Sequence, residues 1–177
     1  NPTVTGASVC EGETVIPTLT TNMITDRWYA DETAITFLQS GYNYKPEAEA
    51  VGNSDKTYYV QREMNGCLSD IVPVVLKVIP KPTFTIGDDI TKCIYDDVET
   101  ISATTFAPVM NDKSDVLWQI KKAKVVTDLD GAEDYTLTPT SVLTTPGDYE
   151  VSAAYKYVSD NIYCMSDTMS FTYSIKD

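Results

Sequence analysis

Short segments in which apolar and polar residues alternate recur along the whole chain. The clearest are residues 71–79 (IVPVVLKVI) and 169–176 (MSFTYSIK), where every second side chain is apolar. A period of two puts the apolar side chains on one face of a β-strand. We find no amphipathic helical stretch of useful length, so the pattern predicts an all-β protein.

Turn residues separate these segments about every 8 to 12 positions, a spacing typical of β-sandwiches. Short strands must bury one face against a second sheet, so two-layered sandwiches are the expected solution. The predicted strands of the first half are residues 14–19, 26–30, 33–38, 42–46, 56–63 and 69–79. Those of the second half are residues 83–86, 98–103, 116–121, 135–137, 147–157 and 165–175.

The chain is an internal repeat. Residues 67–70 (CLSD) recur as residues 164–167 (CMSD), and each copy runs into one of the alternating segments. Aligning the halves on this tetrapeptide also matches their other markers, which are Cys10 with Cys93, Trp28 with Trp118, and a tyrosine-bearing strand before the second cysteine. The two prolines of residues 80–82 favour a short, stiff joint. We therefore predict two domains, residues 1–80 and 81–177.

The four cysteines are Cys10, Cys67, Cys93 and Cys164, with no CxxC spacing that would indicate redox or zinc chemistry. An even number at wide spacing predicts two disulfides, for which three connectivities exist. The repeat favours the pairs Cys10–Cys67 and Cys93–Cys164, one within each domain. Loops of this length give about 4 kcal/mol each in the chain-entropy model. Persistent disulfides imply an oxidising, extracellular or periplasmic compartment.

The order of markers in the first half resembles a known family. Cys10, Trp28-Tyr29, residues 57–60 (TYYV) and residues 66–69 (GCLS) are similar to the Ig-like modules repeated in surface and secreted adhesins of Bacteroidetes-type bacteria. In the second half, residues 118–120 (WQI) and 146–151 (PGDYEV) also resemble polycystic-kidney-disease-type Ig-like domains. The resemblance implies tandem Ig-like antiparallel β-sandwiches. It departs from antibody domains in the spacing of the second cysteine, so the expected bridge would join a domain's edge to its last hairpin.

Charge and composition exclude several classes of function. With 13 Lys and Arg against 26 Asp and Glu, the net charge is −13, so nucleic acid and anionic membrane surfaces are excluded as partners. The chain has no histidine, which excludes triads, Cys/His dyads and imidazole-ligated zinc. No apolar run is long enough for membrane insertion. We expect a non-catalytic segment of a longer protein.

An acidic run in the second domain is the candidate metal site. Asp128, Asp130, Glu133 and Asp134 surround a glycine and resemble an oxygen-rich calcium loop, without the twelve-residue EF-hand spacing. The alternative is a solvated hairpin tip. No other cofactor is expected.

Aromatic residues crowd one region of the first domain. Tyr29, Tyr42 and Tyr44 are the candidate ligand-binding residues, because flat aromatic rings stack on sugar rings. Alternation predicts that Trp28 points into the core and Tyr29 away from it, so the competing interpretation is that part of this cluster is packing.

These observations predict a stalk, spacer or adhesive segment of a secreted or cell-surface protein, with neighbouring domains of the same parent as partners. The alternative is a carbohydrate-binding accessory module, calcium-dependent if the acidic run binds metal. A third possibility is a module that pairs an edge strand with a surface protein. Family resemblance does not decide between them, since this fold hosts many functions.

Overall fold

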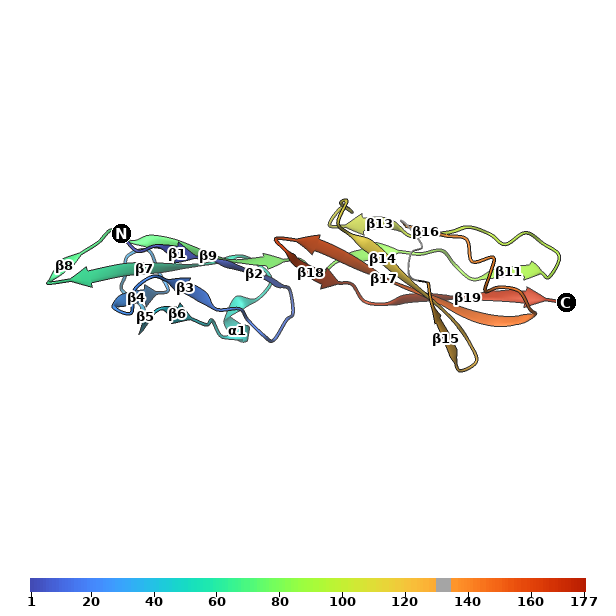
Figure 1. Cartoon of the computed structure of the whole chain (residues 1–177), viewed down its shortest axis with the longest axis horizontal. Helices are drawn as coiled ribbons and strands as arrows, with labels where there is room; N and C mark the ends of the chain where they lie inside the picture. Colours follow the sequence, from blue (N-terminus) through green and yellow to red (C-terminus); the bar gives the residue numbers. More distant parts are fainter. Residues whose placement is uncertain (130–134) are drawn as a thin grey trace. The chain divides into compact units, whose positions relative to one another are not determined.

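The computed structural model describes residues 1–129 and 135–177 and is all-β apart from one helical turn (Figure 1). The chain divides into two compact units, Asn1–Pro80 and Lys81–Asp177. Each unit contains two sets of sheets, as the sequence predicts, and each is described by itself below. No helix among the described residues is long and apolar enough to cross a membrane.

The first unit is a sandwich of a larger and a smaller sheet. The larger sheet has the strand order β2-β9-β7-β4-β5, with β8 paired to β7, and the smaller has the order β1-β3-β6. The strands are β1 (Val4–Thr5), β2 (Ala7–Cys10), β3 (Leu19–Thr21), β4 (Asp26–Tyr29), β5 (Phe37–Ser40), β6 (Asn43–Tyr44), β7 (Lys56–Met64), β8 (Cys67–Leu68) and β9 (Val72–Ile79), and the helical turn is α1 (Ala48–Val51).

The second unit repeats this plan. Its larger sheet has the order β11-β19-β17-β14-β15, with β18 paired to β17, and two ribbons, β10-β13 and β12-β16, complete the unit. The strands are β10 (Thr83–Thr85), β11 (Ile90–Cys93), β12 (Ile101–Ser102), β13 (Thr104–Ala107), β14 (Asp115–Lys122), β15 (Val125–Asp128), β16 (Thr136–Leu137), β17 (Gly147–Ser159), β18 (Ile162–Met165) and β19 (Met169–Lys176).

Alternation along the long strands builds both cores. In β9 and β17 every second side chain is buried, and both tryptophans lie in the interior. The core of the first unit is Val9, Ile16, Leu19, Trp28, Tyr58, Val60, Val74, Leu76 and Val78. The core of the second is Phe84, Ile101, Ala103, Val116, Trp118, Ile120, Leu137, Leu143, Tyr149, Val151, Ala153, Tyr155, Phe171, Tyr173 and Ile175.

The first and last strands of each larger sheet pair in parallel. In the first unit Ala7–Cys10 of β2 lies beside Leu76–Ile79 of β9. In the second unit Ile90–Cys93 of β11 lies beside Tyr173–Lys176 of β19. The remaining neighbours in both sheets are antiparallel. In each unit the strand that opens the larger sheet is therefore hydrogen-bonded to the strand that closes it.

One predicted strand begins later than expected because a carboxylate holds the preceding loop. The Asp31 carboxylate accepts hydrogen bonds from the backbone N–H groups of Thr33, Ile35 and Thr36. The hydrogen bond from the Thr33 hydroxyl, followed by those from the Thr36 and Ile35 backbone N–H groups, holds the pKa of Asp31 well below its usual range. Residues 33–36 form this loop, and β5 begins at Phe37.

The predicted disulfide pairs are wrong. Cys10 and Cys164 are disulfide-bonded, whereas Cys67 and Cys93 have free, exposed thiols. Cys10 lies opposite Ile79 at the end of β9, and Cys67 lies in the hairpin beyond the start of that strand. Eight residues of β9 span about 26 Å, whereas the Cα atoms of a disulfide lie within about 7 Å. The two cysteines are therefore at opposite ends of the first unit, and Figure 1 shows β8 and β2, the strands that carry them, toward opposite ends.

The same geometry separates the cysteines of the second unit. Cys93 lies opposite Lys176, while Cys164 pairs with Tyr157 on β17. Tyr157 is ten residues from Gly147, the residue of β17 that pairs with Ile175, a separation of about 33 Å. The repeat identifies equivalent cysteines but does not say at which end of the sheet each one lies.

Gly6 marks the point at which the chain passes from the smaller sheet to the larger one. It lies between β1 and β2, and a Cβ atom there would come within 2.4 Å of the Val75 carbonyl oxygen. That oxygen belongs to the backbone of β9, so a side chain at residue 6 requires the strand to move. Gly87 connects β10 to β11 in the second unit, and a Cβ atom there has no heavy atom within 4 Å.

We therefore expect Gly6→Ala to lower the free energy of unfolding of the first unit by about 1–3 kcal/mol, the usual range for overpacking. The control Gly87→Ala should be neutral or stabilise by up to about 1 kcal/mol, because it restricts the unfolded chain without a clash. Urea unfolding in Trp118→Phe and Trp28→Phe backgrounds measures the two units separately. Equal effects of the two substitutions would contradict the close approach at Gly6.

Candidate functional site

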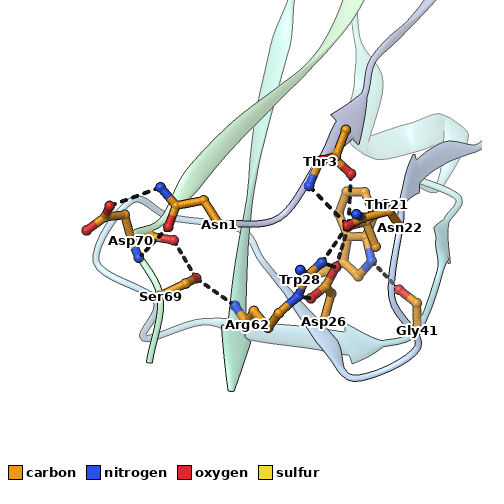
Figure 2. A network of polar contacts seen from close by, with 10 residues as sticks. All are labelled: Asn1, Thr3, Thr21, Asn22, Asp26, Trp28, Gly41, Arg62, Ser69 and Asp70. Atoms are coloured by element: carbon orange, nitrogen blue, oxygen red, sulfur yellow. Dashed lines mark hydrogen bonds and ion pairs between the residues drawn. The ribbon is translucent and has the colours of Figure 1, made fainter. Parts of the chain in front are cut away.

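A buried ion pair is the centre of the polar network in the first unit (Figure 2). Asp26 is completely buried and Arg62 nearly so. Arg62 donates from Nε to Asp26 Oδ1 at 2.6 Å and from Nη2 to Asp26 Oδ2 at 2.8 Å. Two parallel hydrogen bonds between a guanidinium and a carboxylate are among the strongest polar contacts in proteins. The pair joins β4 to the long strand β7, because Asp26 of β4 lies directly opposite Arg62 of β7.

Further polar groups complete the network and bring in the smaller sheet. Thr21 donates its hydroxyl to Asp26 Oδ2 at 2.5 Å and lies within reach of the Thr3 carbonyl at 3.3 Å. Asn22 Oδ1 accepts from Arg62 Nη2 at 2.5 Å and from the Thr3 backbone N–H at 3.1 Å. Side chains from both sheets thus satisfy the buried charges.

The carboxyl group of Asp26 stays ionised in this setting. Burial raises its pKa, but the hydrogen bonds from Arg62 and Thr21 and the charge of Arg62 outweigh burial and hold the pKa below its usual value. The folded unit therefore resists protonation of Asp26 in acid, and the unfolded chain does not. The network stabilises the fold above pH 4.

Sequence reasoning missed this ion pair, although one signal was available. Asp26 and Trp28 lie two positions apart on β4, so a strand that buries Trp28 must also bury Asp26. Arg62 likewise follows Tyr58 and Val60 at alternate positions of β7. An acidic residue at an inward position requires a cationic partner.

The predicted tyrosines do not share one exposed surface. Tyr29 is 7% exposed and lies outside the core cluster, with the Phe37 ring edge-on against it at 5.9 Å. Tyr44 packs on the core, stacked on Trp28 at 5.6 Å and edge-on to Tyr58 at 4.9 Å. Burial raises the pKa of Tyr44 and that of Tyr58. Tyr42 is 50% exposed.

The predicted calcium residues lie largely outside the described part of the chain. Asp130, Glu133 and Asp134 fall in the interval 130–134, and Asp128 ends β15 with its backbone opposite Gln119. Of the other carboxylates, Asp89 accepts from the Thr172 backbone N–H and Asp96 from that of Cys93. Among residues 1–129 and 135–177 no three potential ligands gather into a metal site.

At the positions of the ion pair the second unit has Val116 opposite Tyr155, and its own polar network is formed by a lysine elsewhere, near the end of β14 and the start of β17. Lys122 Nζ donates to the Tyr149 hydroxyl at 3.0 Å and to the carbonyl of Pro146 at 2.9 Å, while the Tyr149 hydroxyl donates to the Thr145 carbonyl at 2.8 Å. Burial raises the pKa of Tyr149, but the bonds from Thr145 and Lys122 outweigh it and lower the pKa. The network fixes the loop that leads into β17 at Gly147.

The repeated tetrapeptide has one structural role in both units. In the first, the Ser69 hydroxyl accepts from the Arg62 backbone N–H at 3.0 Å, and the Ser69 N–H donates to the Arg62 carbonyl at 2.9 Å. In the second, Ser166 makes the same two bonds with Tyr155, at 2.8 and 2.9 Å. Each serine continues the ladder of the long strand where the hairpin strand ends and before the last strand begins.

Each hairpin therefore projects from the sheet with a fixed geometry. Asn65 and Gly66 have positive φ angles of 52° and 78°, and Asp160 and Asn161 have angles of 49° and 62°. Two successive residues of positive φ form the type I′ turn that suits a tight β-hairpin. Cys67 and Cys164 each lie two residues before the serine, so the turn and the serine hold them in place.

The family model described as "Ig-like domain CHU_C associated" matches residues 1–80. No curated protein matches the chain. Among solved structures, the Sidekick-1 immunoglobulin domains 1–5 are similar at 12% identity and a TM-score of 0.42, covering 99% of this chain and 39% of theirs. Human mucin-like protocadherin EC1-2 is similar at 10% identity and a TM-score of 0.32, covering 99% of this chain and 98% of its own. The chain thus spans well under half of the Sidekick-1 structure.

We expect Asp26→Asn to destabilise the first unit by about 3 kcal/mol, because it leaves the Arg62 guanidinium without its charged partner. The double variant Asp26→Leu with Arg62→Met should cost less than the sum of its single variants, since it removes both charges together. Urea unfolding at pH 7 measures these values. Additive single effects would show that the pair is not coupled.

The pH dependence provides a second measurement on the same pair. The lowered pKa of Asp26 means that its contribution is present above about pH 4, the usual aspartate value, and is lost as the pH falls through the folded-state value. Between pH 5 and pH 2 the wild-type first unit should lose more stability than Asp26→Asn does. A parallel loss in both proteins would contradict the assignment.

Proposed function

We propose that this chain, whose first 80 residues form an Ig-like domain of the CHU_C-associated family, is a non-catalytic spacer or adhesive segment of a larger secreted or cell-surface protein. Its task is mechanical: it holds other parts of the protein at a distance and transmits tension between them. Its partners are then the neighbouring domains of the same parent protein.

The parallel pairing of terminal strands carries this proposal. In the first unit the chain enters the larger sheet along β2 and leaves it along β9, and these strands run side by side in the same direction. A load that passes through both strands pulls them along their length in opposite senses. All hydrogen bonds between them are then loaded together, in shear, and must break at once. In an antiparallel terminal pair they would break one after another.

Both units share this arrangement and reinforce it at the same point. Beyond the β2–β9 ladder, the Glu11 backbone N–H donates to the Ile79 carbonyl at 2.8 Å. Beyond the β11–β19 ladder, the Ile94 N–H donates to the Lys176 carbonyl at 2.9 Å. The two units have different polar networks, yet both have a parallel terminal strand pair extended by one more backbone hydrogen bond. This shared feature supports a load-bearing role.

Single-molecule force spectroscopy tests this role directly. With handles on Asn1 and Asp177 of the Cys10→Ser/Cys164→Ser variant, in which no disulfide diverts the force from the strands, each unit should unfold in a separate event. In this background Glu11→Pro should lower the unfolding force of the first unit by removing one donor of the terminal pair. Glu32→Pro, at the second position of the exposed turn between β4 and β5, at the opposite edge of the larger sheet from β2, should leave the force unchanged. Equal forces with and without Glu11→Pro in this background, or equal losses for both variants, would contradict the shear-loaded design.

Carbohydrate binding is the second candidate, and two features favour it. Tyr42 keeps half of its side-chain surface exposed. In the second unit, Phe106, Val109, Met110 and Tyr135 line an apolar hollow of about 530 Å³. Flat aromatic and apolar surfaces of this kind stack on sugar rings.

For a spacer, we expect the chain to bind none of a panel of immobilised polysaccharides, either with calcium or with a chelator. Binding that Tyr42→Ala or Tyr135→Ala removes, and that Tyr95→Ala preserves, would establish carbohydrate recognition instead. Tyr95 is a suitable control because it is 96% exposed and lies outside both features. Loss of binding with chelator would assign a role to the acidic residues around Asp128.

A further inference from the structure

The four cysteines occupy two kinds of position, one at each end of a unit. Cys10 and Cys93 end the first strand of their larger sheets and are called here the strand-end cysteines. Cys67 and Cys164 lie in the hairpins that the serines hold and are called the hairpin cysteines. The β-strands between the two positions keep them about 26 Å or more apart within a unit.

Two cysteines are disulfide-bonded and two are free, and each of these two groups contains one strand-end cysteine and one hairpin cysteine. The disulfide-bonded residues are strand-end Cys10 and hairpin Cys164. The free thiols are hairpin Cys67 and strand-end Cys93, and both are exposed. Each position therefore forms a disulfide in one unit of this chain and presents a thiol in the other. The free thiols occupy positions at which this fold is competent to form a disulfide.

Exposed apolar side chains flank both free thiols. Around Cys67, Met64 is 53% and Leu68 62% exposed. Beside Cys93, Ile94 is 36% and Tyr95 96% exposed. Large apolar groups grouped around a fixed point are typical of a surface that contacts another protein.

The backbone at both thiols is held in place. The type I′ turn and the Ser69 bonds fix the hairpin of Cys67. The Cys93 N–H donates to Asp96 Oδ2 at 2.8 Å, and the next residue, Ile94, is bonded to β19. Rigid presentation of a thiol lowers the entropic cost of docking.

We propose that Cys67 and Cys93 are attachment points at which this chain forms disulfides with further Ig-like units of the same pattern. Cys67 bonds to the strand-end cysteine of another unit and Cys93 to the hairpin cysteine of another unit. Each disulfide therefore joins one strand-end cysteine to one hairpin cysteine. The result is an open, head-to-tail array that is covalent at its junctions. This inference rests on the proposed spacer function, because the junction disulfides would add covalent links between units of an array beside the polypeptide itself.

The chemistry is a two-electron oxidation. Two thiols lose their protons and one electron each as the sulfur–sulfur bond forms, and a dithiol–disulfide oxidoreductase of the oxidising compartment accepts both electrons. In the test-tube, oxidised glutathione takes that role and is reduced to two thiols. The exchange passes through a mixed disulfide on Cys67 or Cys93.

Charge sets the conditions for the test. A chain of net charge −13 repels a second copy, and exposed charges are screened beyond about 8 Å at 0.15 M salt. A second copy of the chain supplies both kinds of partner cysteine, so it serves as the probe. The assay uses a glutathione redox buffer at 0.15 M salt or above.

The experiment mixes single-cysteine variants of the full chain. Cys67→Ser and Cys93→Ser should each stay predominantly monomeric alone, and an equimolar mixture should give a dimer about tenfold above either homodimer on non-reducing gels. Peptide mapping should find Cys67 bonded to Cys93, with Cys10 and Cys164 still oxidised. Wild type should form a ladder of oligomers, and Cys67→Ser/Cys93→Ser should form none.

Two controls separate docking from simple thiol exposure. The variant Ser54→Cys/Cys67→Ser/Cys93→Ser, mixed with Cys67→Ser, presents an exposed thiol on the first unit at another place and should give only background dimer. Met64→Ser/Leu68→Ser should lower the yield severalfold while leaving the reaction of Cys67 with a small disulfide reagent unchanged. Homodimers as abundant as the mixed dimer, or glutathione adducts only, would overturn the proposal. Either result would leave the force measurement on the monomer unaffected.

Discussion

The parallel contact between the first and last strands is the constraint on which each unit depends. It closes the larger sheet, aligns entry and exit of the chain, and fixes which residues lie at which end. Because β9 follows a hairpin that turns back at Asn65-Gly66, the strand-end and hairpin cysteines must lie at opposite ends. The proposed resistance to tension and the positions of the cysteines therefore both follow from the parallel pairing of these strands.

The polar contacts in the interior differ between the two units although both have the same parallel pairing of terminal strands. The first unit joins its strands with the Asp26–Arg62 pair, whereas the second fixes a loop with Lys122 and Tyr149. Even the equivalent tryptophans differ: Trp28 Nε1 donates to the Gly41 carbonyl at 2.9 Å, and buried Trp118 Nε1 has no partner among the described residues.

The long strands β7, β9, β14, β17 and β19 and the internal repeat could be predicted from the sequence because each depends on local pattern. The terminal strands β2 and β11 were not predicted, and the strand predicted at residues 14–19 is wrong except at Leu19. Alternation in β9 and β17 fixes which side chains are buried, and the CLSD/CMSD repeat fixes the equivalent residues. The disulfides could not be predicted, since alternation defines the face of a strand and not the end of the sheet at which a residue lies. The burial of Tyr29 could not be predicted either. Phe37 packs against its ring outside the core cluster, and alternation along a strand does not show such a contact.

The serine contacts also allow the hairpin tips to differ in length without any change in the rest of each sandwich. Ser69 bonds to a residue seven positions earlier and Ser166 to one eleven positions earlier, yet each cysteine pairs two residues beyond that contact. The extra residues of the second hairpin lie past the cysteine, two on each strand, so the alternation of faces is preserved. The tips are consequently sites where evolution or an engineer can insert residues in pairs, for instance to carry a tag or fluorescent label, without shifting either the sulfur atom or the strands under load.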